Sequence, residues 1–295
     1  MLYDVVIIGG SYAGLSAGLQ LARARRRVLV VDAGERRNRF GTMSRGFLTQ
    51  DGVAAAEIAA VGRAQLMEYD GVDWLPARIE RAHHIAGGFE LTDDQGRTHQ
   101  ARLLVLATGV VDELPAIPGL AERWGKQVFH CPYCHGYELN QARIGVLASS
   151  AFSMHQALML PDWGQTTLLL NGSFEPDATQ MAQLQARDVT VERGLVARLA
   201  GASLEVVMRD GRTLPFQGLF IATRLHVSPL AVQLGCALVE GPQGVFIRTD
   251  STQATSLPGV FACGDTARAA GNVALAVGDG ALAGAAAHRA LMFGR

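Results

Sequence analysis

A glycine-rich turn near the N-terminus constrains the fold of this 295-residue chain more than any other feature. The turn, GGSYAG at 9–14, follows the apolar run VVII at 5–8 and precedes a small-residue stretch at 15–24. A second apolar run at 27–31 then ends at Asp32. Apolar β-branched runs form buried parallel strands, and the small-residue stretch between them is typical of a helix. These residues predict a βαβ unit with an acidic side chain about 20 positions beyond the glycines.

The spacing of the turn predicts dinucleotide binding. Glycines let a turn approach a pyrophosphate closely, and the first N–H groups of the following helix bind it. Gly9 and Gly14 fit that pattern, whereas Ser11 stands at the middle glycine position and offers a hydroxyl to the phosphate. Asp32 is expected to bind a ribose hydroxyl pair. The alternative is a tight β–α turn without a ligand.

Two further motifs end apolar runs in the same way. Residues 103–109 read as a buried strand that closes on Thr108-Gly109. The segment GVFACGD at 259–265 is a short apolar strand that closes on Gly264-Asp265, and a long small-residue helix is expected at about 274–291. Together with the first turn, these motifs predict an α/β domain built from both ends of the chain.

The segment HCPYCH at 130–135 contains a pair of closely spaced cysteines. Cys131 and Cys134 have the C-x-x-C spacing that closes a small disulfide ring, which predicts thiol–disulfide exchange. Pro132 stands where proline best begins a helix, and a cysteine at a helix N-terminus has its thiolate favoured. We therefore expect Cys131 to be the attacking thiol. His135 is expected to carry a proton, because the ordinary pKa of imidazole is about 6.5.

Other interpretations of these residues stay open. Zinc binding is an alternative use of C-x-x-C, but the chain has no second paired Cys/His cluster to complete a tetrahedral site. His135 could instead hydrogen-bond only within its loop, and His130 could be purely structural. Cys236 and Cys263 stand alone and are expected to be small buried hydrophobes.

The three glycine motifs resemble the FAD domain of the two-domain flavoprotein disulfide reductases. With C-P-Y-C in the middle of the chain, the resemblance narrows to thioredoxin reductase of the low-molecular-weight type and covers nearly the whole chain. It implies that Cys134 faces the flavin and forms the charge-transfer thiolate, and that His135 stands where the family usually has an acidic proton carrier. It also implies FAD contacts at Gly9, Ser11, Gly14, Asp32, Asn38, Gln50, Asp51, Thr108, Gly109, Gly264 and Asp265.

The family's nicotinamide site is where this sequence departs from the pattern. The turn after the expected strand at 144–148 reads SSAFS, with Gly145 inside the strand, so close approach to a pyrophosphate is not provided for. The next strand, expected at 167–170, ends in NGS, without an arginine for the 2′-phosphate of NADP or an acid for the ribose of NAD. We expect NADPH binding to be weak or absent.

Histidine after the second cysteine resembles another branch of the same fold, the dithiol oxidases of gliotoxin-like and holomycin-like biosynthesis. In that branch a substrate dithiol is oxidised and O2 reoxidises the flavin, with the histidine as base for the incoming thiol. A reductase fed by another donor, such as ferredoxin, is a further alternative. A flavoprotein redox sensor without turnover is the non-enzyme alternative, and His135 favours turnover over it.

The predicted fold class is α/β, with two Rossmann-like three-layer domains. Proline-rich links at 114–119 and 240–244 predict a discontinuous FAD domain at 1–114 and 243–295, with the dithiol domain at 115–242 inserted into it. In the inserted domain a helix is expected at 154–160, and a hairpin is expected to join 204–208 to 214–222.

Composition excludes several classes of partner. The chain is 49% hydrophobic and 18% charged, which is typical of a compact protein, and its net charge of -1 argues against nucleic acid and anionic membranes. It has no apolar run long enough to cross a bilayer and no leader-like N-terminus, which predicts a cytoplasmic location. The expected partner is a thioredoxin-like protein or a small-molecule dithiol or disulfide, and the resemblance implies a homodimer.

Overall fold

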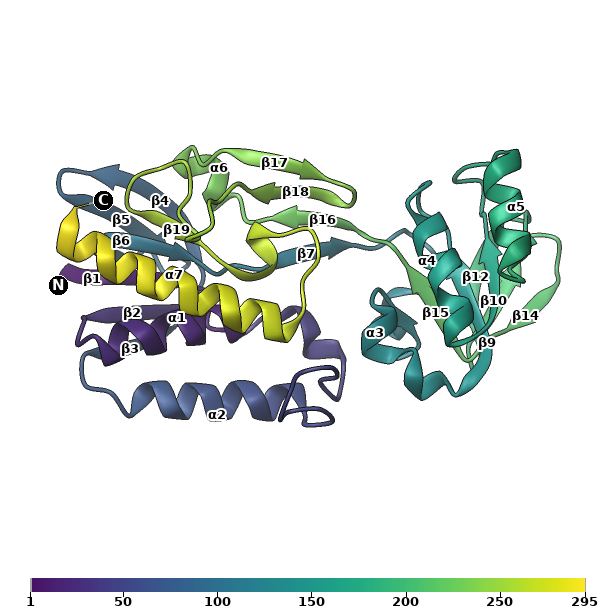
Figure 1. Cartoon of the computed structure of the whole chain (residues 1–295), viewed down its shortest axis with the longest axis horizontal. Helices are drawn as coiled ribbons and strands as arrows, with labels where there is room; N and C mark the ends of the chain where they lie inside the picture. The colour runs from purple at the N-terminus through teal and green to yellow at the C-terminus, as the bar shows by residue number, and fades with distance from the viewer. Residues whose placement is uncertain (1, 295) are drawn as a thin grey trace. The chain divides into compact units, whose positions relative to one another are not determined.

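The computed structural model describes residues 2–294. The chain divides into two compact units (Figure 1). Unit 1 contains the chain up to Val111 and again from Leu225, and unit 2 is the continuous segment Asp112–Arg224. None of the described helices is long and apolar enough to serve as a membrane span.

Unit 1 and the two strands that lead into and out of unit 2 contain these elements in chain order: β1 Leu2–Ile8, α1 Tyr12–Arg23, β2 Val28–Asp32, η1 Arg37–Phe40, α2 Ala55–Met67, β3 Val72–Pro76, β4 Ile79–Ile85, β5 Gly88–Asp93, β6 Thr98–Leu106, β7 Val110–Glu113, β16 Arg224–Val227, α6 Leu230–Leu234, β17 Leu238–Gly241, β18 Gly244–Ile247, β19 Val260–Ala262, η5 Gly264–Ala267 and α7 Val273–Phe293. The main sheet has the order β3-β2-β1-β6-β5-β4, and β19 also pairs with β6. The pairs among β3, β2, β1, β6 and β19 are parallel, whereas β5 and β4 continue the sheet in antiparallel fashion.

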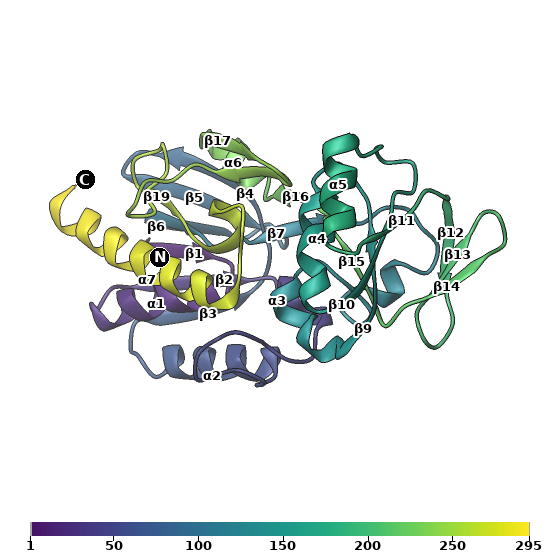
Figure 2. The same cartoon turned by 45° about the vertical axis from the view of Figure 1, so that its right-hand side comes forward.

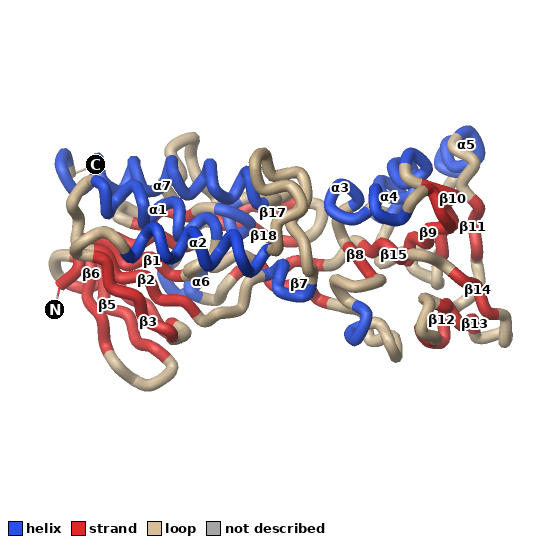
Figure 3. The backbone as a smooth tube through the Cα atoms, turned by 90° about the horizontal axis from the view of Figure 1, so that it is seen from below, coloured by secondary structure: helices blue, strands red, loops and turns tan. Residues whose placement is uncertain are grey.

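The alternating side chains of β1 give the main sheet of unit 1 two cores. Val5 and Ile7 face α1, α2 and α7, which lie together on one side of the sheet (Figure 3). Val6 and Ile8 face the side covered by β4, β5 and α6. Helices α1 and α7 pack against each other so closely that a side chain at Gly280 would overlap the backbone of α1.

Unit 2 contains, in chain order, η2 Ala121–Arg123, β8 Val128–Phe129, α3 Pro132–His135, η3 Tyr137–Leu139, β9 Gln141–Leu147, α4 Ser153–Met159, η4 Leu160–Asp162, β10 Gly164–Leu169, α5 Ala178–Ala186, β11 Thr190–Glu192, β12 Val196–Ala200, β13 Glu205–Met208, β14 Thr213–Pro215 and β15 Gly218–Ile221. A parallel sheet has the order β11-β10-β9-β15-β8, and β12, β13 and β14 form a separate antiparallel sheet (Figure 2). Helices α4 and α5 pack on one face of the parallel sheet, and the small sheet packs on the other. The α/β fold class with two Rossmann-like units is confirmed.

Two sequence-based expectations differ from the structure. The link at 240–244 predicts the return to the first domain near 242, whereas unit 1 resumes at Leu225 because Leu230 and Ala231 of α6 are part of its core. The hairpin expected to join 204–208 to 214–222 is also only half right. Strand β14 pairs with β13, but the rest of the segment is β15, which runs parallel to β9 and belongs to the other sheet.

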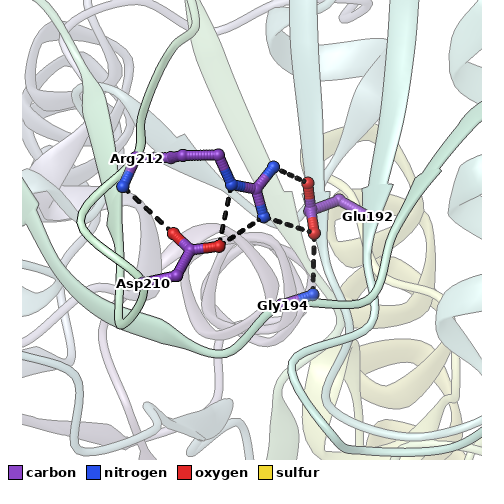
Figure 4. Close-up of polar contacts among 4 residues, drawn as sticks. All are labelled: Glu192, Gly194, Asp210 and Arg212. Atoms are coloured by element: carbon purple, nitrogen blue, oxygen red, sulfur yellow. Dashed lines mark hydrogen bonds and ion pairs between the residues drawn. The ribbon is translucent and has the colours of Figure 1, made fainter.

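An exposed ion-pair network fixes the tip of the small sheet in unit 2 (Figure 4). Arg212 donates to both carboxylate oxygens of Glu192, at 2.7 and 3.1 Å, and its Nε donates to Asp210 at 2.8 Å. Glu192 also accepts from the backbone N–H of Gly194. The hydrogen bonds from Arg212 hold the pKa of Glu192 below its usual value.

Candidate active site

The carboxyl ends of the parallel strands in unit 1 meet at one edge of the sheet. Ile8 at the end of β1 pairs with Val31 on β2 and with Leu106 at the end of β6, and Ala262 at the end of β19 pairs with Leu106 as well. The segments that follow these strands are therefore neighbours. Ligands of open α/β sheets bind at such an edge.

The turn after β1 has the backbone that a pyrophosphate site needs. Gly9 has a φ of +107°, and a side chain there would overlap the carbonyl oxygen of Ala107. A side chain at Gly14 would overlap the carbonyl oxygen of Gly9. Ser11 is the N-cap of α1, and its side chain makes no capping hydrogen bond within the described chain. The first N–H groups of this 12-residue helix thus remain available to an anion.

Asp32 lies against this turn. Its Oδ1 accepts hydrogen bonds from the backbone N–H groups of Gly10 and Gly34, each at 3.2 Å. A side chain at Gly10 would collide with Asp32 and Trp74. The acid predicted from the βαβ spacing therefore stands beside the glycine turn.

Asn38 is tied to the turn through Tyr12, which was not predicted as a site residue. Its Nδ2 donates to the hydroxyl of Tyr12 at 3.0 Å, and that hydroxyl donates to the carbonyl of Ala55 at 2.9 Å. Burial raises the pKa of Tyr12. Asn38 Oδ1 and Ser44 Oγ are buried and have no hydrogen-bond partner among residues 2–294. The position of Tyr12 inside the glycine turn is the signal that could have identified it.

The predicted residues after β6 and β19 are also brought together. Thr108 Oγ1 donates to Thr266 Oγ1 at 3.3 Å, and Asp265 Oδ2 accepts from Arg37 Nη1 at 3.0 Å. Gly109 and Gly264 both have positive φ, +64° and +74°, so each tight turn needs its glycine. Arg37 lies beside Asn38 in the chain but was not predicted as a site residue in its own right.

Gln50 and Asp51 lie in the loop between η1 and α2. Asp51 Oδ1 accepts from the backbone N–H of Gly46 at 2.8 Å, and the N–H of Gln50 donates to the carbonyl of Phe47 at 2.9 Å. The contacts of these two residues are thus with their own loop. Arg45 adds an ion pair to Asp51 at 3.9 Å.

The residues at this edge fit FAD. Side chains at Gly9, Gly10 or Gly14 would collide with neighbouring protein atoms, so only glycines allow this tight turn. The N-terminus of α1 has uncapped N–H groups for a pyrophosphate. Two buried acceptors, Asn38 Oδ1 and Ser44 Oγ, lack partners among the described residues, which is typical of groups that a ligand satisfies.

The cysteine pair of unit 2, Cys131 and Cys134, forms a disulfide with a Cα–Cα distance of 5.3 Å. Cys131 is the extended N-cap of α3, and Pro132 is its first residue, as predicted. Because α3 is a single turn, its dipole favours a thiolate less than a full helix would. Both cysteines are half-buried, so exposure does not distinguish the attacking sulfur from the resolving one.

Aromatic rings support the dithiol turn. The His135 ring stacks on the buried Phe129 ring at 4.1 Å between centroids. Trp163 packs so closely against Gly136 that a side chain there would collide with it, and the Tyr133 ring meets Trp163 edge-on at 5.3 Å. Stacking on Phe129 orients the ring of His135, which is half-buried and follows Cys134 directly in the sequence.

The turn after β9 differs from the turn after β1. The N–H of Ser149 donates to Ser153 Oγ at 3.1 Å, and the N–H of Phe152 donates to Ser150 Oγ at 3.3 Å. Ser173 Oγ donates to the carbonyl of Ala148 at 2.7 Å. Serine side chains therefore occupy N–H groups of the turn that a pyrophosphate would need.

Cys236 and Cys263 are both buried, as predicted, and burial raises the pKa of each thiol. Within residues 2–294 no three His, Cys, Asp or Glu side chains are arranged to hold a metal ion.

Known proteins resemble this chain over its full length. The family model described as pyridine nucleotide-disulphide oxidoreductase matches residues 3–280. The chain is 33% identical to thioredoxin reductase tcpT of Claviceps purpurea, with 99% of this chain and 95% of that protein covered. The crystal structure of an oxidoreductase from Agrobacterium tumefaciens superposes with a TM-score of 0.97 at 55% identity and covers 100% of both chains. A putative thioredoxin reductase TrxB from Bacillus anthracis has a TM-score of 0.91 at 28% identity, with 98% of each chain covered.

Proposed function

We propose that this chain, which belongs to the pyridine nucleotide-disulphide oxidoreductase family, exchanges electrons between FAD and a thiol substrate through Cys131 and Cys134 with little use of NADPH. It is an FAD-dependent disulfide oxidoreductase of the thioredoxin reductase type. The observation that carries the proposal is the pairing of a closed C-x-x-C disulfide with a turn after β9 whose N–H groups are taken by serines. The first feature supports thiol–disulfide exchange. The second supports weak nicotinamide binding.

The FAD-holding residues of this proposal are those at the strand ends of unit 1. The N–H groups after Ser11 bind the pyrophosphate, and Asp32 binds a ribose. Bound FAD supplies a two-electron donor or acceptor for the dithiol. The further proposed contacts are Gly9, Gly14, Asn38, Gln50, Asp51, Thr108, Gly109, Gly264 and Asp265.

The chemistry of the dithiol balances in either direction. In oxidation, a substrate thiolate attacks Cys131 Sγ, the Cys131–Cys134 bond breaks, and Cys134 leaves as a thiolate. A second substrate thiol attacks the mixed disulfide and releases Cys131, so the substrate loses two electrons and two protons. In reduction, the Cys131 thiolate attacks a substrate disulfide and Cys134 resolves the mixed disulfide. His135 takes the proton of the incoming thiol or returns it to the leaving one.

A dithiol oxidase is the second candidate, and the turn after β9 favours it. An oxidase needs an electron acceptor such as O2 and no nicotinamide donor, which agrees with a turn closed by Ser150 and Ser153. A reductase fed by a non-nicotinamide donor agrees with the same turn. The proposed substrate is a thioredoxin-like protein or a small dithiol or disulfide, and a cytoplasmic homodimer remains our expectation.

Anaerobic mixing tests the proposal. The yellow holoenzyme is mixed separately with NADPH, NADH, reduced thioredoxin and a small dithiol, and the loss of flavin absorbance is followed. We expect a dithiol to bleach the flavin, and NADPH to act only at concentrations far above the micromolar range. Fast bleaching by micromolar NADPH would overturn the weak nicotinamide site. Readmitted O2 should restore the colour if the oxidase direction is correct, and a catalytically silent sensor would show no turnover in any mixture.

Two variants separate the roles of the site residues. Cys134→Ser should abolish turnover and the long-wavelength absorbance that a thiolate gives the reduced holoenzyme. His135→Ala should lower the rate by about 100-fold or more and shift its pH profile, because proton transfer is lost. Survival of both turnover and absorbance in the first variant, or an unchanged pH profile in the second, would refute the corresponding role.

A further inference from the structure

Gln156 connects α4 to the peptide that precedes the dithiol. It lies in the middle of α4 and is 5% exposed. Its Nε2 donates to the carbonyl oxygen of His130 at 2.8 Å. His130 immediately precedes Cys131, so the hydrogen bond fixes one side of the peptide that leads into the redox pair.

The other half of the Gln156 amide has an energetic cost. Its Oε1 is buried and has no hydrogen-bond partner among residues 2–294. An unpaired buried acceptor destabilises the fold, and an apolar side chain of similar length would avoid that cost. Packing alone therefore does not account for an amide here, and the hydrogen bond to His130 is the contribution that an apolar side chain would lack.

The peptide held by Gln156 lies between two fixed segments. Phe129 on β8 is paired with Phe220 on β15, and Pro132 begins α3. Between them, Cys131 has the extended backbone of an N-cap, with φ -112° and ψ 111°. Cys131 therefore links the peptide that Gln156 holds to the turn of α3, which carries Cys134.

We propose that Gln156 is a positioning residue for the dithiol: by holding the His130 carbonyl it keeps Cys131 within bonding reach of Cys134 and favours the disulfide over the dithiol. The proposal rests on the proposed function for its relevance to turnover. Its test concerns only the cysteine couple and does not require turnover.

Equilibration with glutathione measures the couple. Two glutathione thiols reduce the Cys131–Cys134 bond, which gives two cysteine thiols and one glutathione disulfide, with two electrons and two protons transferred. Gln156→Met should shift this equilibrium about fivefold to tenfold toward the dithiol, because one hydrogen bond that favours ring closure is lost. A tenfold shift corresponds to about 30 mV in the reduction potential of the pair.

Gln127→Met is the matched control. Gln127 also donates its Nε2 to a backbone carbonyl in unit 2, that of Ala202 at 3.0 Å, and it lies three positions before His130. Wild-type and variant holoenzymes are equilibrated anaerobically in glutathione buffers at neutral pH, alkylated with iodoacetamide, and the modified cysteines are counted by mass spectrometry. We expect a shifted midpoint for Gln156→Met and an unchanged one for Gln127→Met.

Two outcomes would overturn the role of Gln156: an unchanged midpoint in Gln156→Met, or an equal shift in Gln127→Met. Gln156→Asn is a second variant for the case in which the methionine variant does not fold. It keeps the amide but is one methylene too short to reach His130 from the same backbone, so the same direction of shift is expected. If the wild-type cysteines fail to titrate as one two-electron couple, the proposed function fails instead, whatever the variants do.

Discussion

Units 1 and 2 contain the same strand–turn–helix connection with opposite chemistry. The turn from β1 into α1 is built of glycines, and the first N–H groups of the helix are uncapped within the described chain. The turn from β9 into α4 is built of serines, whose hydroxyls accept from the N–H groups of Ser149 and Phe152. The two turns therefore share a topology and differ in whether their N–H donors are already occupied. This difference is the basis of the weak nicotinamide binding that we propose for unit 2.

The charged groups of the two units differ in how deeply they are buried. In unit 1, Asp93 is 1% exposed and accepts from His99 Nε2 at 3.0 Å and from Arg97 Nε at 2.8 Å. In unit 2, Arg212 bridges Glu192 and Asp210 at the surface. A buried carboxylate depends on every one of its partners, whereas an exposed network is replaced by water at little cost.

The largest effect is expected from Gly14→Val, which would displace the backbone of the glycine turn after β1. Its side chain would overlap the carbonyl oxygen of Gly9 and crowd Ile7, so the turn and the start of α1 must move. We expect FAD affinity to fall by about 100-fold or more, because in the proposed site this turn binds the pyrophosphate. The flavin-to-protein absorbance ratio of the purified variant and FAD titration of the apoprotein measure it.

Gly278→Ala is the control for that variant. Gly278 lies in α7, and apart from its chain neighbours and the adjacent backbone of its own helix no heavy atom of the described residues stands within 4 Å of an added side chain. This variant should keep its FAD and gain up to about 1 kcal/mol of stability, since alanine favours helix more than glycine does. A Gly14→Val protein that keeps its full FAD content would contradict the role of the glycine turn in binding FAD.

Asp93→Asn should give the next largest effect. Burial raises the pKa of Asp93, but hydrogen bonds from His99 and Arg97 outweigh it and leave the pKa well below the ordinary value. The NH2 group of asparagine cannot accept the hydrogen bonds that one carboxylate oxygen accepts now, and the negative charge is lost, so the free energy of unfolding should fall by about 3 kcal/mol near pH 7. Urea unfolding of the variant and of Asp94→Asn, an exposed neighbour, measures the difference.

The pH dependence of that difference has a definite sign. A carboxyl whose pKa is lowered on folding stabilises the folded state above its unfolded pKa of about 3.9. The stabilisation is lost as the pH falls from there toward the folded pKa. The gap between wild type and Asp93→Asn should therefore be full at about pH 6 and narrower at about pH 3. A gap that does not change with pH would contradict the role of the Asp93 charge.

Ser153→Ala tests the closed turn with a smaller effect. It removes the acceptor of the Ser149 N–H, which should cost about 1 kcal/mol of stability. Ser150 and Ser173 still bind the turn, so NADPH should remain a poor reductant of the flavin. Thermal unfolding and anaerobic mixing measure the two outcomes, with the exposed Ser203→Ala as control. Efficient NADPH oxidation by Ser153→Ala would show that one hydroxyl alone closes the site.

Arg212→Met should have the smallest effect. The lowered pKa of Glu192 means that its ion pair stabilises the fold above the unfolded pKa of about 4.3 and that this contribution is lost as the pH falls below it. Because the network is exposed, we expect a slight fall in Tm at low salt that vanishes at about 1 M salt, where screening is strong. The exposed Arg209→Met is the control, and a large salt-independent fall would show that the network is structural.

Local patterns in the sequence predicted most of the elements of the candidate site. The strand–turn–helix at Gly9, the acid at Asp32 and the proline after Cys131 are each encoded by residues close together in the chain, and the structure has the corresponding elements. The ion pair of Arg37 with Asp265 joins residues more than two hundred positions apart, so no periodicity reports it.

The expectations that failed also depended on long-range packing. The apolar segment that contains Leu219 suits a hairpin strand and a buried parallel strand equally well by its composition. Only its pairing with Gly145 of β9 determines that it is a parallel strand. In the same way, the amide of Gln156 reaches His130 across the unit, where sequence spacing gives no sign of contact. Tertiary contacts, not local propensity, set these features.

The two ends of unit 2 lie within a hydrogen bond of each other. Thr223 Oγ1 donates to Asp112 Oδ1 at 2.6 Å, and the strands that carry the chain in and out, β7 and β16, are neighbours in one sheet. A flexible loop of the length of 112–224 would cost unit 1 on the order of 4 kcal/mol in closure entropy before its halves could meet. Once unit 2 has folded, that entropy is already lost, and the halves of unit 1 are presented to each other. Unit 2 is continuous and is synthesised before Leu225 onward, so its folding brings together the two chain segments that form unit 1.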